Sequence, residues 1–340
     1  MERAALRRSF VHRHASHCES GVMSSLLRHE GMALSEAMAF GLSSALAFAY
    51  LPFVRLNGLP LIAYRMPPGA IISGLNRGLH LGARFETFRS RQAGMERLDA
   101  LLDAGKLVGL QTSIYWLPYI PRALRFHFNA HNLLVYGREG DEYLVSDPVA
   151  ETVVRCARSD LERARFAKGV LAPKGRLYYL TRPPAVADWG KLGRGALTRT
   201  ARIMLHTPLP LIGVRGIRWL ARSVERLPLD DAGDAARLYI GHIVRMQEEI
   251  GTGGAGFRFM YASFLQELAA ASGYAALDGL AGRLVMIGDR WQDFALAAAR
   301  MIKHRAPLEP PKLAERLREL ALEEKGFFRD LDEARRAWPH

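Results

Sequence analysis

The chain changes its pattern near Arg182-Pro183-Pro184, and this change limits the folds that it can adopt. Before this point, short apolar runs typical of strands alternate with segments of helical period. After it, nearly every segment has helical period. With 340 residues, of which 49% are hydrophobic, the chain is long enough for two cores. We therefore predict a mixed helix-and-strand domain at residues 1–182, a linker at about 183–195 and an α-helical domain at 196–340.

Local patterns place elements in both domains. The apolar stretch Met38–Phe53 is shorter than the ~20 residues that a membrane span needs, and the helical spacing of its small and apolar residues predicts a buried helix. We expect strands in the first domain at 60–64, 84–88, 107–115 and 176–180, helices at 92–104 and 160–166, and a hairpin at 130–147. In the second domain we expect helices at 232–250, 257–272, 276–303 with a break near Gly288, and 311–337.

Cys18, one of two cysteines, stands at the start of a helix-like run, Cys18-Glu19-Ser20-Gly21. A helix N-terminus stabilises a thiolate and lowers the thiol pKa below about 8.5, and its N–H groups can form half of an oxyanion hole. The alternative is a small buried apolar side chain, which is the role we expect for Cys156. A partner base would favour the nucleophile.

Such a base occurs in the predicted hairpin. If Arg138-Glu139-Gly140 form a three-residue loop, His131 lies directly opposite Asp147, and a carboxylate there can orient the imidazole. A four-residue loop would instead move Asp147 to the other face of the hairpin. The pattern predicts a cysteine nucleophile served by a histidine base and an acid.

A zinc site is the competing interpretation of the same region. His12, His14, His17 and Cys18 offer zinc-ligand types within a short segment. No second ligand cluster of matching spacing follows, so we favour a polar lead-in segment and expect no metal.

The net charge of +13 favours acidic macromolecular partners. Arg215, Arg218, Arg222 and Arg226 share one helix face, which can also be a solvated face without a partner. The sequence shows no zinc-finger spacing or RNA-recognition signature, so we expect no nucleic-acid partner. Docking of Leu209–Leu227 on a membrane surface stays an alternative. We expect no transmembrane segment, and the two cysteines and the absence of an apolar core in Met1–Arg8 indicate the cytoplasm.

A glycine-rich loop, Gly251–Gly256, joins two predicted helices. Its backbone N–H groups, the following helix N-terminus and Arg258 can together bind an anion. A glycine-capped helix end followed by a tight turn needs the same residues. The loop lacks the Gly-Lys-Ser/Thr ending of a nucleotide-binding loop, so ATP is not indicated.

These motifs, in their order and spacing, resemble a known family. The first part of the chain resembles the N-terminal domain of butirosin biosynthesis protein H-like acyltransferases, which is similar to the papain-like cysteine peptidases that process bacteriocin leaders. Gly251–Leu265 resembles the signature of the helical domain that accompanies it. The motifs of the first part are Cys18-Glu19-Ser20-Gly21, Leu34–Leu42, Leu117-Pro118-Tyr119, His131-Asn132 and Ser146-Asp147-Pro148.

The resemblance implies an α+β fold, with a papain-like domain built on a central antiparallel sheet and a mainly α-helical C-terminal domain. It also implies acyl transfer, in secondary metabolite biosynthesis, from the phosphopantetheine thioester of an acidic acyl carrier protein to an amine of a small molecule. Cys18 is then the nucleophile, His131 the base and Asp147 the orienting acid. Papain-like enzymes place a Gln shortly before the Cys, and His12 stands there by position.

We expect the substrate to contact Tyr119, Gly253, Gly254 and Arg258. No cofactor is expected beyond the phosphopantetheine that the carrier protein brings. Two other functions stay open, namely a papain-like peptidase or amidase that uses the same three residues and a binding module without catalysis. The sequence also leaves a homodimer open.

Overall fold

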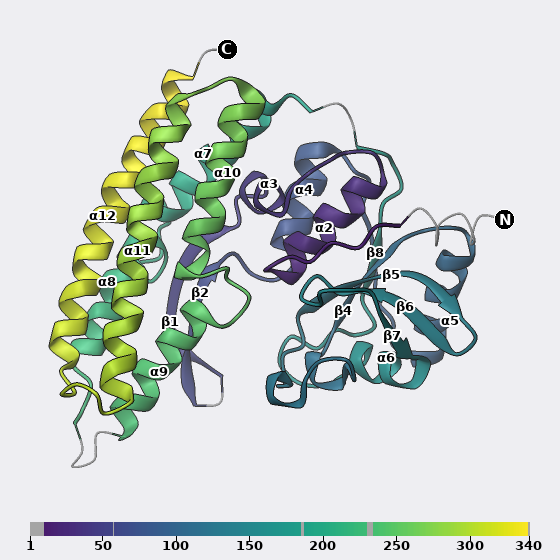
Figure 1. The fold of residues 1–340 in the computed structure, drawn as a ribbon, viewed down its shortest axis with the longest axis horizontal. Helices are drawn as coiled ribbons and strands as arrows, with labels where there is room; N and C mark the ends of the chain where they lie inside the picture. Colours follow the sequence, from purple (N-terminus) through teal and green to yellow (C-terminus); the bar gives the residue numbers. More distant parts are fainter. Residues whose placement is uncertain (1–9, 57, 185–186, 230–233, 339–340) are drawn as a thin grey trace. The chain divides into compact units, whose positions relative to one another are not determined.

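The computed structural model describes residues 10–56, 58–184, 187–229 and 234–338 (Figure 1). The described residues form two compact units. The first unit takes its residues from Met1–Ala39 and Ile71–Ala187, and the second from Phe40–Ala70 and Asp188–His340. The sequence predicted one boundary, at 183–195; the chain also passes between the units at both ends of the segment 40–70.

The first unit is built on one six-stranded sheet with the strand order β3-β8-β4-β5-β6-β7. Every neighbouring pair in it is antiparallel, as predicted. The strands β4, β5 and β6 are almost fully buried, which explains why they read as apolar runs in the sequence. The strands span Arg84–Glu86 (β3), Val108–Thr112 (β4), His131–Glu139 (β5), Glu142–Ser146 (β6), Val154–Ala157 (β7) and Leu177–Tyr179 (β8).

Helices pack around this sheet. Helix α2 lies against β5, and α5 and α6 contribute Met95, Leu98 and Leu161 to the core beside Leu133 and Val145. The helices are α2 (Cys18–His29), α3 (Glu36–Leu42), α4 (Ala70–Leu79), α5 (Arg91–Asp103) and α6 (Arg158–Arg165), with short 3-10 turns at Ile114–Trp116 and Arg122–Leu124. Helices α3 and α4 cross the boundary between the units.

The second unit joins a two-stranded antiparallel ribbon to a set of helices. The long helices α10, α11 and α12 lie side by side, and α12 also packs along α7 and α8 (Figure 1). The ribbon consists of β1 (Leu46–Leu56) and β2 (Leu59–Arg65). The helices are α7 (Trp189–His206), α8 (Gly213–Glu225), α9 (Asp234–Glu248), α10 (Arg258–Ser272), α11 (Ala276–Ile302) and α12 (Pro310–Ala337), with a 3-10 turn at Ala255–Phe257.

Three predicted elements differ from the structure. The predicted helix Met38–Phe53 is wrong, because α3 ends at Leu42 and β1 begins at Leu46. Ser44, at φ 59°, turns the chain between them. A short apolar run does not distinguish a strand from a helix by period alone. Helix α11 continues through Gly288, and α7 begins at Trp189 inside the predicted linker.

Several predicted segments reach beyond the described residues. These are Met1–Arg8, linker residues 185–186 and residues 232–233 of the predicted helix 232–250. Within the described ranges, no helix has both the length and the apolar character needed to cross a membrane.

Candidate active site

Cys18 is the first residue of α2, and a partly buried carboxylate, that of Glu36, holds the chain segment that leads into this helix. The N–H groups of Ser16 and His17 donate to Glu36 at 3.0 and 2.6 Å, and the Ser20 hydroxyl donates to the same carboxylate at 3.2 Å. Burial raises the pKa of Glu36, and these hydrogen bonds oppose the rise. Glu36 therefore fixes the entry into α2 and with it the position of Cys18.

Glu19 and Gly21, which follow Cys18, contact different segments of the first unit. Glu19 is fully buried and accepts hydrogen bonds from the N–H groups of Ile71 and Ile72, at 3.0 and 3.3 Å, at the start of α4. A Cβ on Gly21 would come within 2.7 Å of the Cβ atoms of Ala15 and Pro148. The Cys18–Gly21 motif therefore serves packing as well as chemistry.

His131 and Asp147 form a buried pair, with Nε2 donating to Oδ2 at 2.7 Å. Asp147 has no exposed surface and His131 only 3%. Burial alone would lower the pKa of His131, but the charge and hydrogen bond of Asp147, with a side-chain hydrogen bond to Cys18, raise it to about 10. Because Nε2 faces Asp147, Nδ1 is the nitrogen left for the sulfur.

The predicted strand register of the hairpin is wrong, although His131 and Asp147 do pair. Strands β5 and β6 turn through Gly140-Asp141 alone, and the pairing shifts by one residue between Val135 and Gly137. Leu134 faces Ser146, so continuing the ladder would set Asp147 opposite Leu133. His131 is then a diagonal neighbour on the same face, within reach of a carboxylate.

Tyr119 contacts Asp147, where the sequence predicted contact with substrate. Its hydroxyl donates to Asp147 Oδ2 at 2.8 Å, the oxygen that also binds His131. Burial, followed by the charge of Asp147, raises the pKa of Tyr119 well above its usual value, so the phenol stays a donor. The other carboxylate oxygen accepts from the Val149 N–H at 3.2 Å. Tyr119 thus orients the acid.

His12, the positional substitute for Gln, is engaged elsewhere. Its Nε2 donates to the Ala150 carbonyl at 3.0 Å, and its Nδ1 accepts from the Ser146 hydroxyl at 2.7 Å. His12 therefore fastens the lead-in segment to the loop after β6, and an oxyanion at Cys18 would rely on the first-turn N–H groups of α2. In the described part of the chain no three His, Cys, Asp or Glu side chains group closely enough to hold a metal.

At the predicted anion site of Gly253, Gly254 and Arg258, groups of the protein accept hydrogen bonds from Gly254 and Arg258. The N–H of Gly254 donates to the Thr252 hydroxyl, and that of Ala255 to the Glu248 carboxylate. Gly253, Gly254 and Gly256 have φ of 67°, 88° and 55°, as a tight turn requires. The alternative interpretation, a glycine-capped turn, describes this loop.

Arg258 is fully buried and ion-paired. Its guanidinium donates to Glu324 at 2.8 and 3.1 Å and to the Gly256 carbonyl at 2.7 Å. It also lies 5.2 Å from the ring centroid of Trp291, whose Nε1 donates to the same Glu324. Arg258 thus has a structural role inside the second unit, because its donors face internal acceptors.

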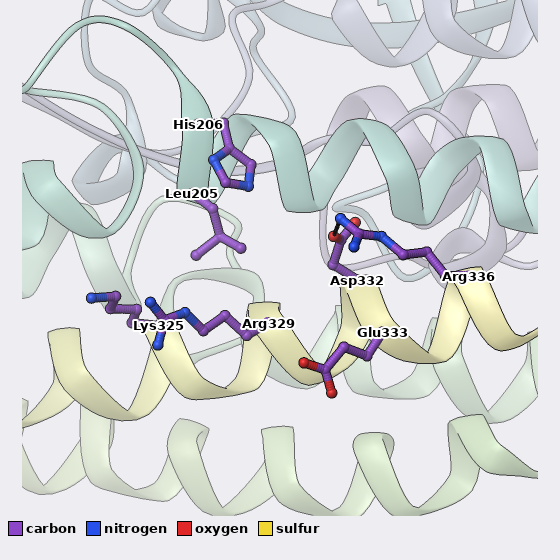
Figure 2. A pocket seen from close by; sticks show the side chains of 7 residues that line it. All are labelled: Leu205, His206, Lys325, Arg329, Asp332, Glu333 and Arg336. Carbon is purple, nitrogen blue, oxygen red and sulfur yellow. Dashed lines mark hydrogen bonds and ion pairs between the residues drawn. The ribbon is translucent and has the colours of Figure 1, made fainter.

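A cavity of about 410 Å³ lies between the end of α7 and α12 (Figure 2). Its lining mixes both charges, and Asp332 is paired with Arg336. None of the residues predicted to act in catalysis or substrate binding lines it. The lining residues are Leu205, His206, Lys325, Arg329, Asp332, Glu333 and Arg336.

Sequence reasoning missed Glu19 and Glu36, the two acids that hold the surroundings of Cys18. Both stand in the first turn of a helix, which is a common place for an exposed acid. Their partners come from segments that lie 52 and 20 residues away in the chain, so no local pattern marks them.

Comparisons with known proteins find family matches for two parts of the chain. Residues 17–148, which include Cys18, His131 and Asp147, match the family described as butirosin biosynthesis protein H, N-terminal. Residues 159–331 match a domain of unknown function (DUF4872). A solved structure described as a C39-like peptidase from Bacillus anthracis is 13% identical, covers 52% of this chain and 96% of its own, and has a TM-score of 0.37. No curated protein matches the sequence.

Proposed function

Because this chain belongs to the butirosin biosynthesis protein H-like family, we propose that it is an acyltransferase in which Cys18 carries the acyl group. The observation that supports this most is the buried His131–Asp147 pair, in which His131 also interacts with Cys18, inside one unit. A protonated imidazole beside a sulfur at a helix N-terminus favours the thiolate, which is the nucleophilic form.

In the first half-reaction, the Cys18 thiolate attacks the carbonyl carbon of a thioester on an acidic acyl carrier protein. The new C–S bond forms as the oxyanion develops beside the first-turn N–H groups of α2. The bond to the pantetheine sulfur then breaks, and the His131 imidazolium gives its proton to that leaving sulfur. An acyl-cysteine and a neutral imidazole result.

In the second half-reaction, an amine of a small acceptor attacks the acyl-cysteine. His131 takes a proton from the attacking nitrogen, and the Cys18 sulfur leaves as the thiolate. Asp147 stabilises the imidazolium that forms and holds its ring orientation. The enzyme returns to its starting charge state, with an amide as product and no cofactor of its own. We place this reaction in secondary metabolite biosynthesis in the cytoplasm.

The test separates transfer from hydrolysis. The protein is incubated with S-acetyl, S-octanoyl and S-benzoyl pantetheine and a set of primary amines, and products are identified by mass spectrometry. The proposal predicts amide products with at least one thioester. Peptide cleavage without any amide product would instead support the peptidase, and the absence of both reactions would support the binding module.

A matched pair of variants assigns the reaction to a residue. Cys18→Ser should abolish amide formation, whereas Cys156→Ser should retain it. Burial, with the charges of Asp160 and Glu142, raises the pKa of Cys156 to about 12, so its thiol stays protonated and unreactive. Equal loss in both variants would count against the assignment.

A further inference from the structure

Two loops of the first unit are both rich in apolar and basic residues and contact each other. The segment 113–130 joins β4 to β5, and the segment 166–176 joins α6 to β8. The Asn129 side chain donates to the carbonyls of Lys168 and Val170 at 3.1 and 2.9 Å. Gln111 Nε2 donates to the carbonyls of Asn129 and Leu171. These bonds join the two loops into one surface, which we call the loop surface.

The loop surface exposes large apolar side chains. Leu124 is 62% and Val170 67% exposed, well beyond the exposure of an apolar side chain in a core. A group of exposed apolar residues often marks an interaction site. Its other members are Tyr115, Trp116, Phe126 and Leu171.

The loop surface also carries only positive charge. Neither segment contains an Asp or a Glu, and together they contain Arg122, Arg125, Lys168, Lys174 and Arg176. In the part of the chain that the structure describes, none of these five side chains pairs with a carboxylate. Arg125 donates to two carbonyls and Arg176 to the Gln111 side chain. Positive charge around apolar contacts fits an acidic protein partner.

The loop surface adjoins the reacting groups. Segment 113–130 ends one residue before His131, and Thr112, just before the segment, pairs with His131 across the ladder. Tyr119, in the middle of the segment, contacts Asp147. A partner bound here can therefore direct a flexible thioester arm toward Cys18.

From this placement we propose that the loop surface is the docking site for the acidic carrier protein that delivers the acyl thioester. The inference rests on the proposed function and adds the surface that recognises the donor. The rival surface is the arginine face of α8 in the second unit, where Glu225 interrupts the positive charge and pairs with Arg318.

The test compares two double variants that change the net charge equally. Arg122→Glu with Lys168→Glu alters the loop surface, and Arg222→Glu with Arg226→Glu alters α8. Binding of an acidic acyl carrier protein is measured by calorimetry with Cys18→Ala protein, so that no chemistry intervenes. We expect the loop-surface variant to raise the Kd about tenfold at low salt, with a smaller difference at about 0.5 M salt, and the α8 variant to leave it unchanged.

A kinetic comparison separates this inference from the proposed function. With Cys18 restored, the loop-surface variant should lower the ratio of the acylation rate from the carrier to the rate from the matching pantetheine thioester. If pantetheine thioesters acylate Cys18 but the loop-surface charges do not alter carrier binding, the docking site is wrong and the transferase stands. If the carrier binds as predicted but Cys18 is never acylated, the transferase is wrong. A loss in the α8 variant alone would overturn the docking site.

Discussion

One carboxylate oxygen organises the candidate site at the scale of residues. Asp147 Oδ2 accepts from both His131 and Tyr119, while Oδ1 accepts from the Val149 N–H. A fully buried carboxylate needs such partners, because an unpaired buried charge is costly. The resulting negative charge opposes the effect of burial on His131 and keeps the imidazole protonated at neutral pH.

Asp147→Asn removes that charge with little change in shape. Because Asp147 raises the pKa of His131 toward 10, its loss should lower that pKa. The alkaline fall of the Cys18 acylation rate, which follows loss of the His131 proton, should then move to lower pH. The rate at neutral pH should fall by about 10²-fold or more. A pH–rate profile of acylation measures both effects, and an unmoved alkaline fall would contradict the role given to Asp147.

Tyr119→Phe should behave differently, since the phenol is a neutral donor. Without it the Asp147 charge is less stabilised and interacts more strongly with His131, so the alkaline fall should stay in place or move to higher pH. The acylation rate constant should fall about tenfold, with little change in KM for a pantetheine thioester. A rise in KM with an unchanged acylation rate constant would instead support the sequence-based prediction that Tyr119 contacts the substrate.

The sequence predicts the positions of Cys18, His131 and Asp147 better than the contacts around them. Cys18 was predicted to begin a helix, as α2 does, and the hairpin pattern predicted that His131 and Asp147 would meet, as they do. The two-residue turn at Gly140-Asp141 and the bulge at Tyr136 together set a strand register that differs from the predicted one. Tyr119 and Arg258 were placed at the substrate because a polar side chain reveals nothing about an internal partner until the fold provides one.

At the scale of elements, contact between α2 and the loop after β6 brings the nucleophile to the base. The Ala15 N–H donates to the Pro148 carbonyl at 2.7 Å, and Gly21 lies against both residues. A two-residue hairpin turn, with Gly140 at φ 58°, sets the register of β6 and with it the position of Asp147. The site is therefore assembled by backbone contacts as much as by side chains.

Gly21→Ala tests this contact. An added methyl group would meet Ala15 and Pro148 at 2.7 Å, and the overpacking should cost about 1–3 kcal/mol despite the better helix propensity of alanine. Gly282→Ala in α11 is the control, because nothing lies within 4 Å of its added methyl group. The control should gain up to about 1 kcal/mol. Denaturant unfolding gives the free energy of unfolding of both variants. If Gly21→Ala leaves this free energy unchanged, the contact between α2 and the loop after β6 does not limit the packing there.

One segment of ambiguous period explains the main error in the predicted fold. The segment 38–53 is mostly apolar, and the helical spacing of some of its residues predicted a helix, although a short apolar run fits a strand as well. Pairing with Leu59–Arg65 decides in favour of β1, and that partner lies beyond the window of any local pattern. Most helices of the second unit were predicted because their segments are long and have helical period, although α7 begins inside the predicted linker and α11 continues through Gly288.

At the scale of the whole molecule, the chain runs through the two units in alternation. Residues 40–70 leave the first unit and form the ribbon of the second, where Phe48 and Tyr64 lie 6.3 and 5.6 Å from the Trp291 ring. The predicted boundary at 183–195 treated the units as successive, because a linker rich in proline and glycine is visible in sequence while an interleaved segment is not.

A fragment of residues 1–187 should therefore fold poorly. It would retain the ribbon but lose Trp291 and the helices that bury Phe48 and Tyr64. We expect the fragment to aggregate, or to be cleaved by protease within residues 40–70, under conditions where the full chain stays intact. A soluble fragment with residues 40–70 protected from cleavage would contradict the interleaved arrangement.

The most direct test of the account is the intact mass of the protein after brief exposure to the pantetheine thioesters, before any amine is added. We expect a gain of one acyl group, located by peptide mapping on Cys18, absent in Cys18→Ser and kept in Cys156→Ser. A gain that persists in Cys18→Ser, or no gain with any thioester or loaded carrier, would contradict the claim that Cys18 carries the acyl group.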